Sequence, residues 1–237
     1  LNFELKALCK RNREGSYSTQ HSRRQLLQLC ASKLPSLGYT HMEASSLKPK
    51  HIESLVEQWK TEGLSVGTLK QRLSALRWWA EKIGKPNVIA KDNAMYGIGS
   101  RQFVCRDSKA QALTSESLAN IRDPYTHASL RLQQAFGLRR EEAIKFIPRY
   151  ADQGDSIRLK SSWTKGGKER VIPVRTVEQR ALLYELTQRY GNSALIPPEC
   201  RYIQQLRRYE KQTTRAGLHK LHGLRHAYAQ NRYRELA

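Results

Sequence analysis

Residues 156–174 read SIRLKSSWTKGGKERVIPV and contain the clearest strand pattern in the chain. Polar and apolar side chains alternate over 156–160, and residues 170–174 form a second, mostly apolar run. A basic turn with two adjacent glycines, Gly166 and Gly167, separates the two runs. Two short strand-like runs joined by a glycine turn at this spacing are typical of a β-hairpin.

Helical patterns surround this hairpin on both sides. The predicted helices share apolar spacing of three and four residues or a capping signal, and they cover residues 114–122, 124–136, 139–146, 176–190, about 199–215, and 222 towards the end. One small hairpin among helices predicts a mainly α fold with a small β-hairpin or sheet, in the α+β class.

The N-terminal half has helical periodicity and no strand pattern. One predicted helix begins at Pro49, and capping boxes predict two others that begin near Ser22 and Thr68. Glycines at 97 and 99 interrupt the pattern. We therefore predict a helical domain over 1–95, a linker over 96–112 and a mixed domain over 113–237.

The 237 residues carry 42 Lys and Arg against 21 Asp and Glu, a net charge of +21. The excess is spread over both halves, so it is no basic tail, and it favours a polyanionic partner. No apolar run approaches the roughly 18 residues that a membrane span needs. The four cysteines are far apart, which favours reduced thiols in a cytoplasmic protein.

Three segments have the residue types of phosphate chemistry. In the first, Gly137 precedes Arg139 at a helix start, with Glu142 three residues later. In the second, Lys165 lies on the glycine-rich hairpin tip, where a lysine can enter a groove or donate a proton. Alone, the first segment is better explained as the salt-bridged start of a surface helix, and the second is a weak signal because basic hairpin turns are common.

The third segment is His219-Lys220-Leu221-His222-Gly223-Leu224-Arg225-His226. A helix presents His222 and Arg225 on one face, and this pair suits a phosphate that gains charge in a transition state. The histidines also leave zinc binding or a buried histidine open, although no H-E-x-x-H frame is present.

Together and in this order, the three segments resemble those of the tyrosine recombinase (phage integrase) family. The matching stretches are G-L-R-R-E-E at 137–142, K-G-G-K-E-R-V-I-P at 165–173 and H-G-L-R-H-A-Y-A at 222–229. The N-terminal half resembles the SAM-like core-binding domain of that family, and residues 113–237 resemble its catalytic domain.

The resemblance implies strand exchange through a 3′-phosphotyrosine intermediate, with no metal and no cofactor. Arg139 and Arg225 would hold the scissile phosphate, Lys165 would protonate the leaving oxygen, and His222 would act as acid or base. Glu142 would support them. The expected DNA-contacting residues are Lys70, Arg72, Arg77, Lys168 and Arg170.

The family places its nucleophilic tyrosine a few tens of residues beyond the arginine that Arg225 matches. We assign neither Tyr228 nor Tyr233 to that role, since both follow Arg225 too closely. The expectation is therefore a chain truncated before its nucleophile, which binds DNA without cleaving it.

The expected partner is double-stranded DNA, gripped by two basic domains, and no membrane. The full-length protein is expected to form a homotetramer on DNA, and this chain a monomer. Three alternatives stay open: a non-catalytic DNA-binding regulator on the same scaffold, a basic RNA-binding protein, and a type IB topoisomerase.

Overall fold

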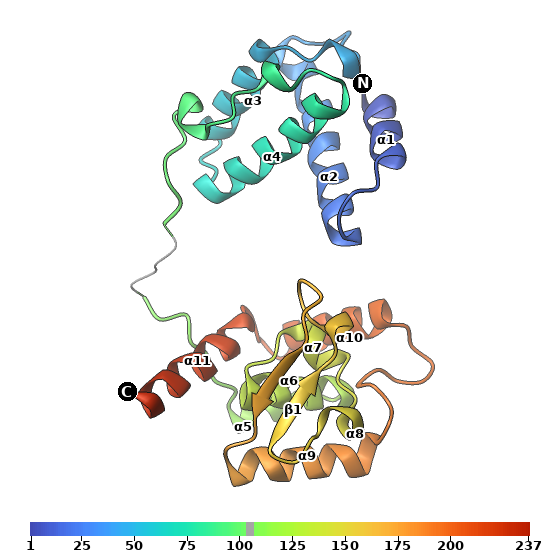
Figure 1. The fold of residues 1–237 in the computed structure, drawn as a ribbon, viewed down its shortest axis with the longest axis vertical. Helices are drawn as coiled ribbons and strands as arrows, with labels where there is room; N and C mark the ends of the chain where they lie inside the picture. Colours follow the sequence, from blue (N-terminus) through green and yellow to red (C-terminus); the bar gives the residue numbers. More distant parts are fainter. Residues whose placement is uncertain (103–106) are drawn as a thin grey trace. The chain divides into compact units, whose positions relative to one another are not determined.

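The computed structural model describes residues 1–102 and 107–237. The chain divides into two units, Leu1–Val104 and Cys105–Ala237, and each is described by itself (Figure 1). Residues 103–106, which include Cys105 and part of the predicted 96–112 linker, lie outside the described residues.

Four α-helices form the N-terminal unit over residues 1–102: α1 (Asn2–Arg11), α2 (Tyr17–Lys33), α3 (Pro49–Thr61) and α4 (Val66–Lys82). Their apolar faces enclose one core, in which Trp59 and Trp79 are fully buried. The indole N–H of Trp79 donates to the carbonyl of Ala44 (2.9 Å). Burial of such large side chains supplies much of the hydrophobic stabilisation of a small helical unit.

The predicted start of α3 at Pro49 is confirmed, but the starts predicted for α2 and α4 are wrong. Ser22 lies inside α2, which is capped by Ser16, and α4 is capped by Ser65, whose hydroxyl accepts from the backbone N–H of Thr68 (3.3 Å). Each true cap has extended backbone, which lets its side chain reach a free amide of the first turn.

The C-terminal unit contains α5 (Ser115–Ala119), α6 (Pro124–Phe136), α7 (Arg140–Ile144), α8 (Pro148–Ala151), β1 (Ser156–Leu159), β2 (Arg170–Pro173), α9 (Val177–Tyr190), α10 (Tyr202–Arg215) and α11 (His222–Leu236). None of the helices in the described ranges, 1–102 and 107–237, has the length and apolarity that a membrane crossing requires.

The strands β1 and β2 pair antiparallel, with Ser156 opposite Pro173 and Leu159 opposite Arg170. This pairing confirms the predicted hairpin, and with the surrounding helices it confirms the mainly α fold with a small β-hairpin. The loop between the strands stands out from the rest of the unit (Figure 1). The strand side chains Ile157 and Leu159 are fully buried, so the hairpin is fixed on the core of the unit at its base.

Trp163 fixes the hairpin loop to that core. It lies in a short 3-10 turn, Ser161–Trp163, and only 6% of its surface is exposed. Its ring packs against Tyr150 (5.6 Å between centroids) and Phe146 (6.2 Å). The loop therefore has a rigid base beneath its exposed glycine tip.

Candidate functional site

Glu142 is the buried anion at the centre of the site. Its side chain, in the first turn of α7, has no exposed surface. The backbone N–H of Arg139 donates to Oε2 (2.8 Å), and the Arg139 guanidinium donates from Nη1 to Oε1 (2.7 Å). The carboxylate thus satisfies a free amide at the helix start and holds the arginine that precedes the helix.

Arg170, at the start of β2, reaches the same carboxylate from the hairpin. Its Nη1 lies 3.0 Å from each oxygen of Glu142. The side chains of Arg139 and Arg170 are 35% and 28% exposed. Each guanidinium therefore contacts the buried carboxylate and also remains accessible to an anion from solvent. The two ion pairs also join the hairpin to α7.

Arg225, in the first turn of α11, completes what we call the arginine cluster (Arg139, Arg170 and Arg225). Its Nη1 donates to the carbonyl of Gly137 (2.6 Å), the residue that ends α6. Partial burial, followed by the charges of Arg170 and Arg139, lowers the pKa of Arg225. A guanidinium nevertheless stays protonated at physiological pH, so the three side chains are all cations.

The cluster holds more positive charge than its acid neutralises. Burial by itself raises the pKa of Glu142, but hydrogen bonds from Arg139 and the charge of Arg170 outweigh it and hold the pKa below its usual value. Glu142 is therefore ionised at neutral pH. Three guanidiniums around one carboxylate leave about two positive charges, which suits an anionic oxygen group such as a phosphate.

His222 lies beside the cluster on α11. Desolvation, the ring of His226 and the charges of Arg225 and Arg139 lower the pKa of His222. The two imidazole rings meet edge to face, with 5.2 Å between centroids. A lowered pKa keeps His222 neutral at neutral pH, so one ring nitrogen is free to accept a proton.

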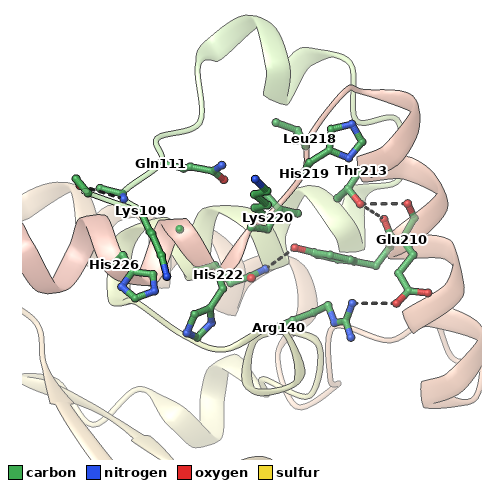
Figure 2. A pocket seen from close by; sticks show the side chains of 16 residues that line it. Lys109, Gln111, Arg140, Glu210, Thr213, Leu218, His219, Lys220, His222 and His226 are labelled. Atoms are coloured by element: carbon green, nitrogen blue, oxygen red, sulfur yellow. Dashed lines mark hydrogen bonds and ion pairs between the residues drawn. The ribbon is translucent and has the colours of Figure 1, made fainter. Parts of the chain in front are cut away.

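A cavity of about 1070 Å³ opens next to these histidines. Figure 2 shows His222, His226 and Arg140 along its lower side and Glu210 and Thr213 at one end. Arg140 is paired with Glu210 (2.9 Å), which is the only acidic residue among those that line the cavity in the described part of the chain. The cavity wall is thus mainly cationic or neutral, which favours an anionic occupant.

The structure places Lys165 on the exposed loop between β1 and β2. Lys165 and Lys168 are exposed on the hairpin loop, where Gly166 and Gly167 have φ values of 89° and 66°. The role of Lys165, like that of Lys168, stays a prediction.

Two of the three predicted DNA-contacting residues of α4 make contacts inside the N-terminal unit. Arg77 donates to the carbonyl of Ala90 (2.9 and 3.0 Å) and to Oδ1 of Asn93 (2.8 Å). The guanidinium of Arg72 lies 5.0 Å from the ring centre of Trp59. Lys70 is half-buried. DNA contacts by these three residues stay predictions.

Gly137 is the position where the site leaves no room for a side chain. Its φ is 59°, and a Cβ there would lie 2.5 Å from Cδ1 of Tyr228. We expect Gly137→Ala to destabilise the C-terminal unit by about 2–4 kcal/mol, since left-handed strain and overpacking add. Urea denaturation, followed by hydrogen exchange of peptides from this unit, measures the change.

Gly154→Ala is the matched control for that substitution. Gly154 also has a positive φ, 84°, but nothing lies within 4 Å of an added Cβ. Strain alone should then cost about 1–2 kcal/mol. Equal losses in the two variants would show that the contact between Gly137 and Tyr228 adds nothing to the stability.

The sequence analysis expects Arg170 to contact DNA, and that stays a prediction. The structure adds a contact that the sequence did not indicate, because Arg170 pairs with Glu142 beside Arg139. The spacing of Glu142 from Arg139 signals the helix cap, but nothing local in the sequence relates residue 170 to residue 142. The tertiary fold of the hairpin base onto α7 makes that contact.

Two known families match the chain, over successive stretches of the sequence. Residues 1–89 match the family described as "Phage integrase, N-terminal", and residues 98–231 match the family described as "Integrase". Among curated protein sequences, the chain has no match.

Solved structures of recombinases share the fold. A lambda integrase dimer bound to a COC′ core site is similar with a TM-score of 0.63 and 15% identity, over 97% of this chain and 88% of that one. A lambda integrase tetramer bound to a Holliday junction is similar with a TM-score of 0.64 and 13% identity, over 98% of this chain and 70% of that one. XerH recombinase bound to difH is similar with a TM-score of 0.59 and 17% identity, over 99% of this chain and 74% of that one.

These likenesses support the fold, and the family matches go further. The integrase family alone spans more than half of the 237 residues and includes the arginine cluster, His222 and the hairpin. This chain therefore belongs to the phage integrase family of tyrosine recombinases.

Proposed function

We propose that this chain is a site-specific DNA recombinase that binds duplex DNA and places a scissile phosphate on the arginine cluster. The observation that carries the proposal is the set of three guanidiniums around the buried carboxylate of Glu142. Basic residues in both units would supply the wider, sequence-tolerant contacts to the DNA backbone.

The phosphate chemistry follows from the charges. A phosphodiester carries one negative charge, and attack by an oxygen nucleophile adds a second in the transition state. Arg139 and Arg225 would bind the non-bridging oxygens, so the excess charge of the cluster stabilises the transition state more than the ground state. Arg170 and Glu142 would hold Arg139 in place for that contact.

Proton transfer falls to the remaining side chains. When the nucleophile bonds to phosphorus, the bond to the 5′-oxygen breaks, and that oxygen must take up a proton to leave as an alcohol. Lys165 on the hairpin loop would donate it. His222, neutral at neutral pH, would accept the proton that the attacking hydroxyl loses.

The nucleophile is a tyrosine in this family, and we propose that the 237-residue chain binds DNA without forming the covalent intermediate. Two observations support this. The ring of Tyr228 is partly buried and packs against Gly137 beside the core, and Tyr233 is 73% exposed on the far part of α11. Several copies would assemble on DNA as a tetramer, and the free chain would be a monomer.

A pool of nicked duplexes of randomised sequence tests this binding without cleavage. The chain should retain duplexes in a native gel, and denaturing electrophoresis should release every bound strand. Competition with double-stranded RNA of equal length should displace little DNA. A denaturation-resistant adduct would refute the absence of a nucleophile, and stronger binding of RNA would refute DNA as the partner.

A further inference from the structure

The turn that leads into α11 is strained. Lys220 has a φ of 53°, and in the described residues it is the one non-glycine residue with a positive φ. A left-handed conformation costs a residue with a Cβ about 1–2 kcal/mol, so surrounding contacts must hold it. The turn comes directly before His222 and Arg225, the two residues of α11 that contribute to the site.

Gln111 makes the contacts that hold this turn. With its amide nitrogen directed at the turn, Gln111 donates to the carbonyls of His219 (2.9 Å) and Lys220 (3.1 Å). Its backbone N–H donates to the carbonyl of Gly223 (3.1 Å). Figure 2 shows the Gln111 side chain directed toward Lys220 across the upper side of the cavity. One residue thus bonds three carbonyls around the start of α11.

The 108–111 segment packs closely along α11. A Cβ on Gly223 would lie 2.7 Å from the carbonyl oxygen of Lys109 and 2.7 Å from Cγ of Gln111. Farther along the helix, the Ser108 hydroxyl and the Gln230 side-chain amide are within hydrogen-bond distance (3.0 Å). Residue 223 must therefore be glycine for the segment to reach the turn.

We propose that Gln111 is a positioning residue that holds the first turn of α11 and thereby sets His222 and Arg225 against the phosphate-binding cluster. This inference rests on the proposed function. The Lys220 carbonyl connects Gln111 to the first turn of α11, because it accepts hydrogen bonds from the Gln111 side-chain amide and from the backbone N–H of Gly223 (2.8 Å).

Gln111→Met separates the hydrogen bonds from the packing. Methionine keeps the length of the side chain and its contact with Gly223, but it cannot donate to the two carbonyls. Gln188→Met, at an exposed position of α9, is the matched control. Without DNA, amides 219–225 of Gln111→Met should exchange with solvent on the order of tenfold faster, from the loss of the two side-chain hydrogen bonds.

Titration of the histidines by NMR separates a local effect from general loosening of the unit. A local effect changes the pKa of His222 alone, whereas general loosening would change the pKa of other histidines as well. The pKa of His222 should rise toward the ordinary histidine value in Gln111→Met, since a loosened first turn of α11 lets water reach the ring and moves it away from Arg139. His127 on α6, whose pKa is lowered by burial and by Arg131, should titrate unchanged. Unchanged titration of His222 with unchanged exchange would overturn the proposal.

Gly223→Ala provides an independent second variant. The added methyl group displaces the 108–111 segment, so it should reproduce both effects of Gln111→Met. Gly99→Ala, where nothing lies within 4 Å of an added Cβ, is its control. If Gly223→Ala leaves His222 unchanged, the proposal is wrong.

Repeating the NMR measurement with duplex DNA distinguishes a failure of this proposal from a failure of the proposed function. Duplex DNA should shift the His222 resonance of the wild-type chain, and the shift should be smaller in Gln111→Met. If DNA leaves the wild-type resonance unmoved, the proposed phosphate site fails, while the measurements without DNA still decide whether Gln111 positions the turn.

Discussion

Replacement of Glu142 by alanine is expected to destabilise the C-terminal unit by about 3–5 kcal/mol. The substitution leaves two partly buried guanidiniums, those of Arg139 and Arg170, without their shared anion. It also leaves the backbone N–H of Arg139 unpaired at the start of α7. Hydrogen exchange across a urea series follows the unit through its own peptides and gives the free energy of unfolding.

Glu141→Ala is the control, because it removes a carboxylate from the neighbouring position. Glu141 is 51% exposed, and in the part of the chain that the structure describes its ion pair is with Lys145, the C-cap of α7, so its loss should cost at most about 1 kcal/mol. Equal effects of the two substitutions would contradict the central role of Glu142.

The pH dependence of Glu142→Gln checks the same contact. Because the folded state lowers the pKa of Glu142, its ionisation stabilises the fold above the ordinary carboxyl pKa. That contribution is lost as the pH falls through the folded-state pKa. The stability difference between wild type and Glu142→Gln should therefore shrink in acid.

The affinity of the chain for duplex DNA is expected to fall on the order of 10³-fold between about 50 and about 200 mM salt. The physical reason is counterion release: each phosphate that a lysine or arginine neutralises frees condensed cations from the duplex. A net charge of +21, spread over both units, supplies enough basic side chains for many such contacts. Fluorescence anisotropy over a salt series measures the slope.

Single substitutions show how much each residue contributes to the slope of log affinity against log salt concentration. Arg225→Gln removes one proposed phosphate contact, so it should reduce the magnitude of this slope by about 0.9. Arg131→Gln is the matched control, since Arg131 is already paired through both Nη atoms with Glu185 (2.7 and 2.8 Å). If the slope of Arg225→Gln equals that of Arg131→Gln, Arg225 does not contact phosphate.

The parts of the fold that local sequence determines were predictable. Strand alternation and the glycine turn located the hairpin, and Pro124 with Gly137 bounded α6 at both ends. The ordered motifs also pointed to the integrase family, which the family matches confirm.

Other parts of the fold depend on tertiary contacts, which the periodicity of the sequence does not reveal. Helix α1 was not predicted, because within it only Leu5 and Leu8 are buried and its apolar stripe is short. Capping boxes at Ser22 and Thr68 match the sequence signal, yet the helices start earlier, where Ser16 and Ser65 have extended backbone. A cap motif indicates a possible start, and tertiary packing selects among several.

The site shows the same division. The motifs placed Arg139, His222 and Arg225 near one another through local helix geometry and family resemblance. The pairing of Arg170 with Glu142 and the bonds of Gln111 to the turn at Lys220 join segments far apart in the chain. No local rule gives such contacts, because they depend on how separate elements pack.

The distribution of tryptophan gives the hairpin a natural spectroscopic label. Three of the four tryptophans lie on α3 and α4, and the fourth is Trp163 at the base of the loop that bears Lys165. Lys160 and Tyr150 lie beside it, with Nζ 4.0 Å from the centre of the Tyr150 ring. Fluorotryptophan incorporated throughout would therefore give one fluorine resonance that senses the ring environment of this loop, with no foreign probe in the protein.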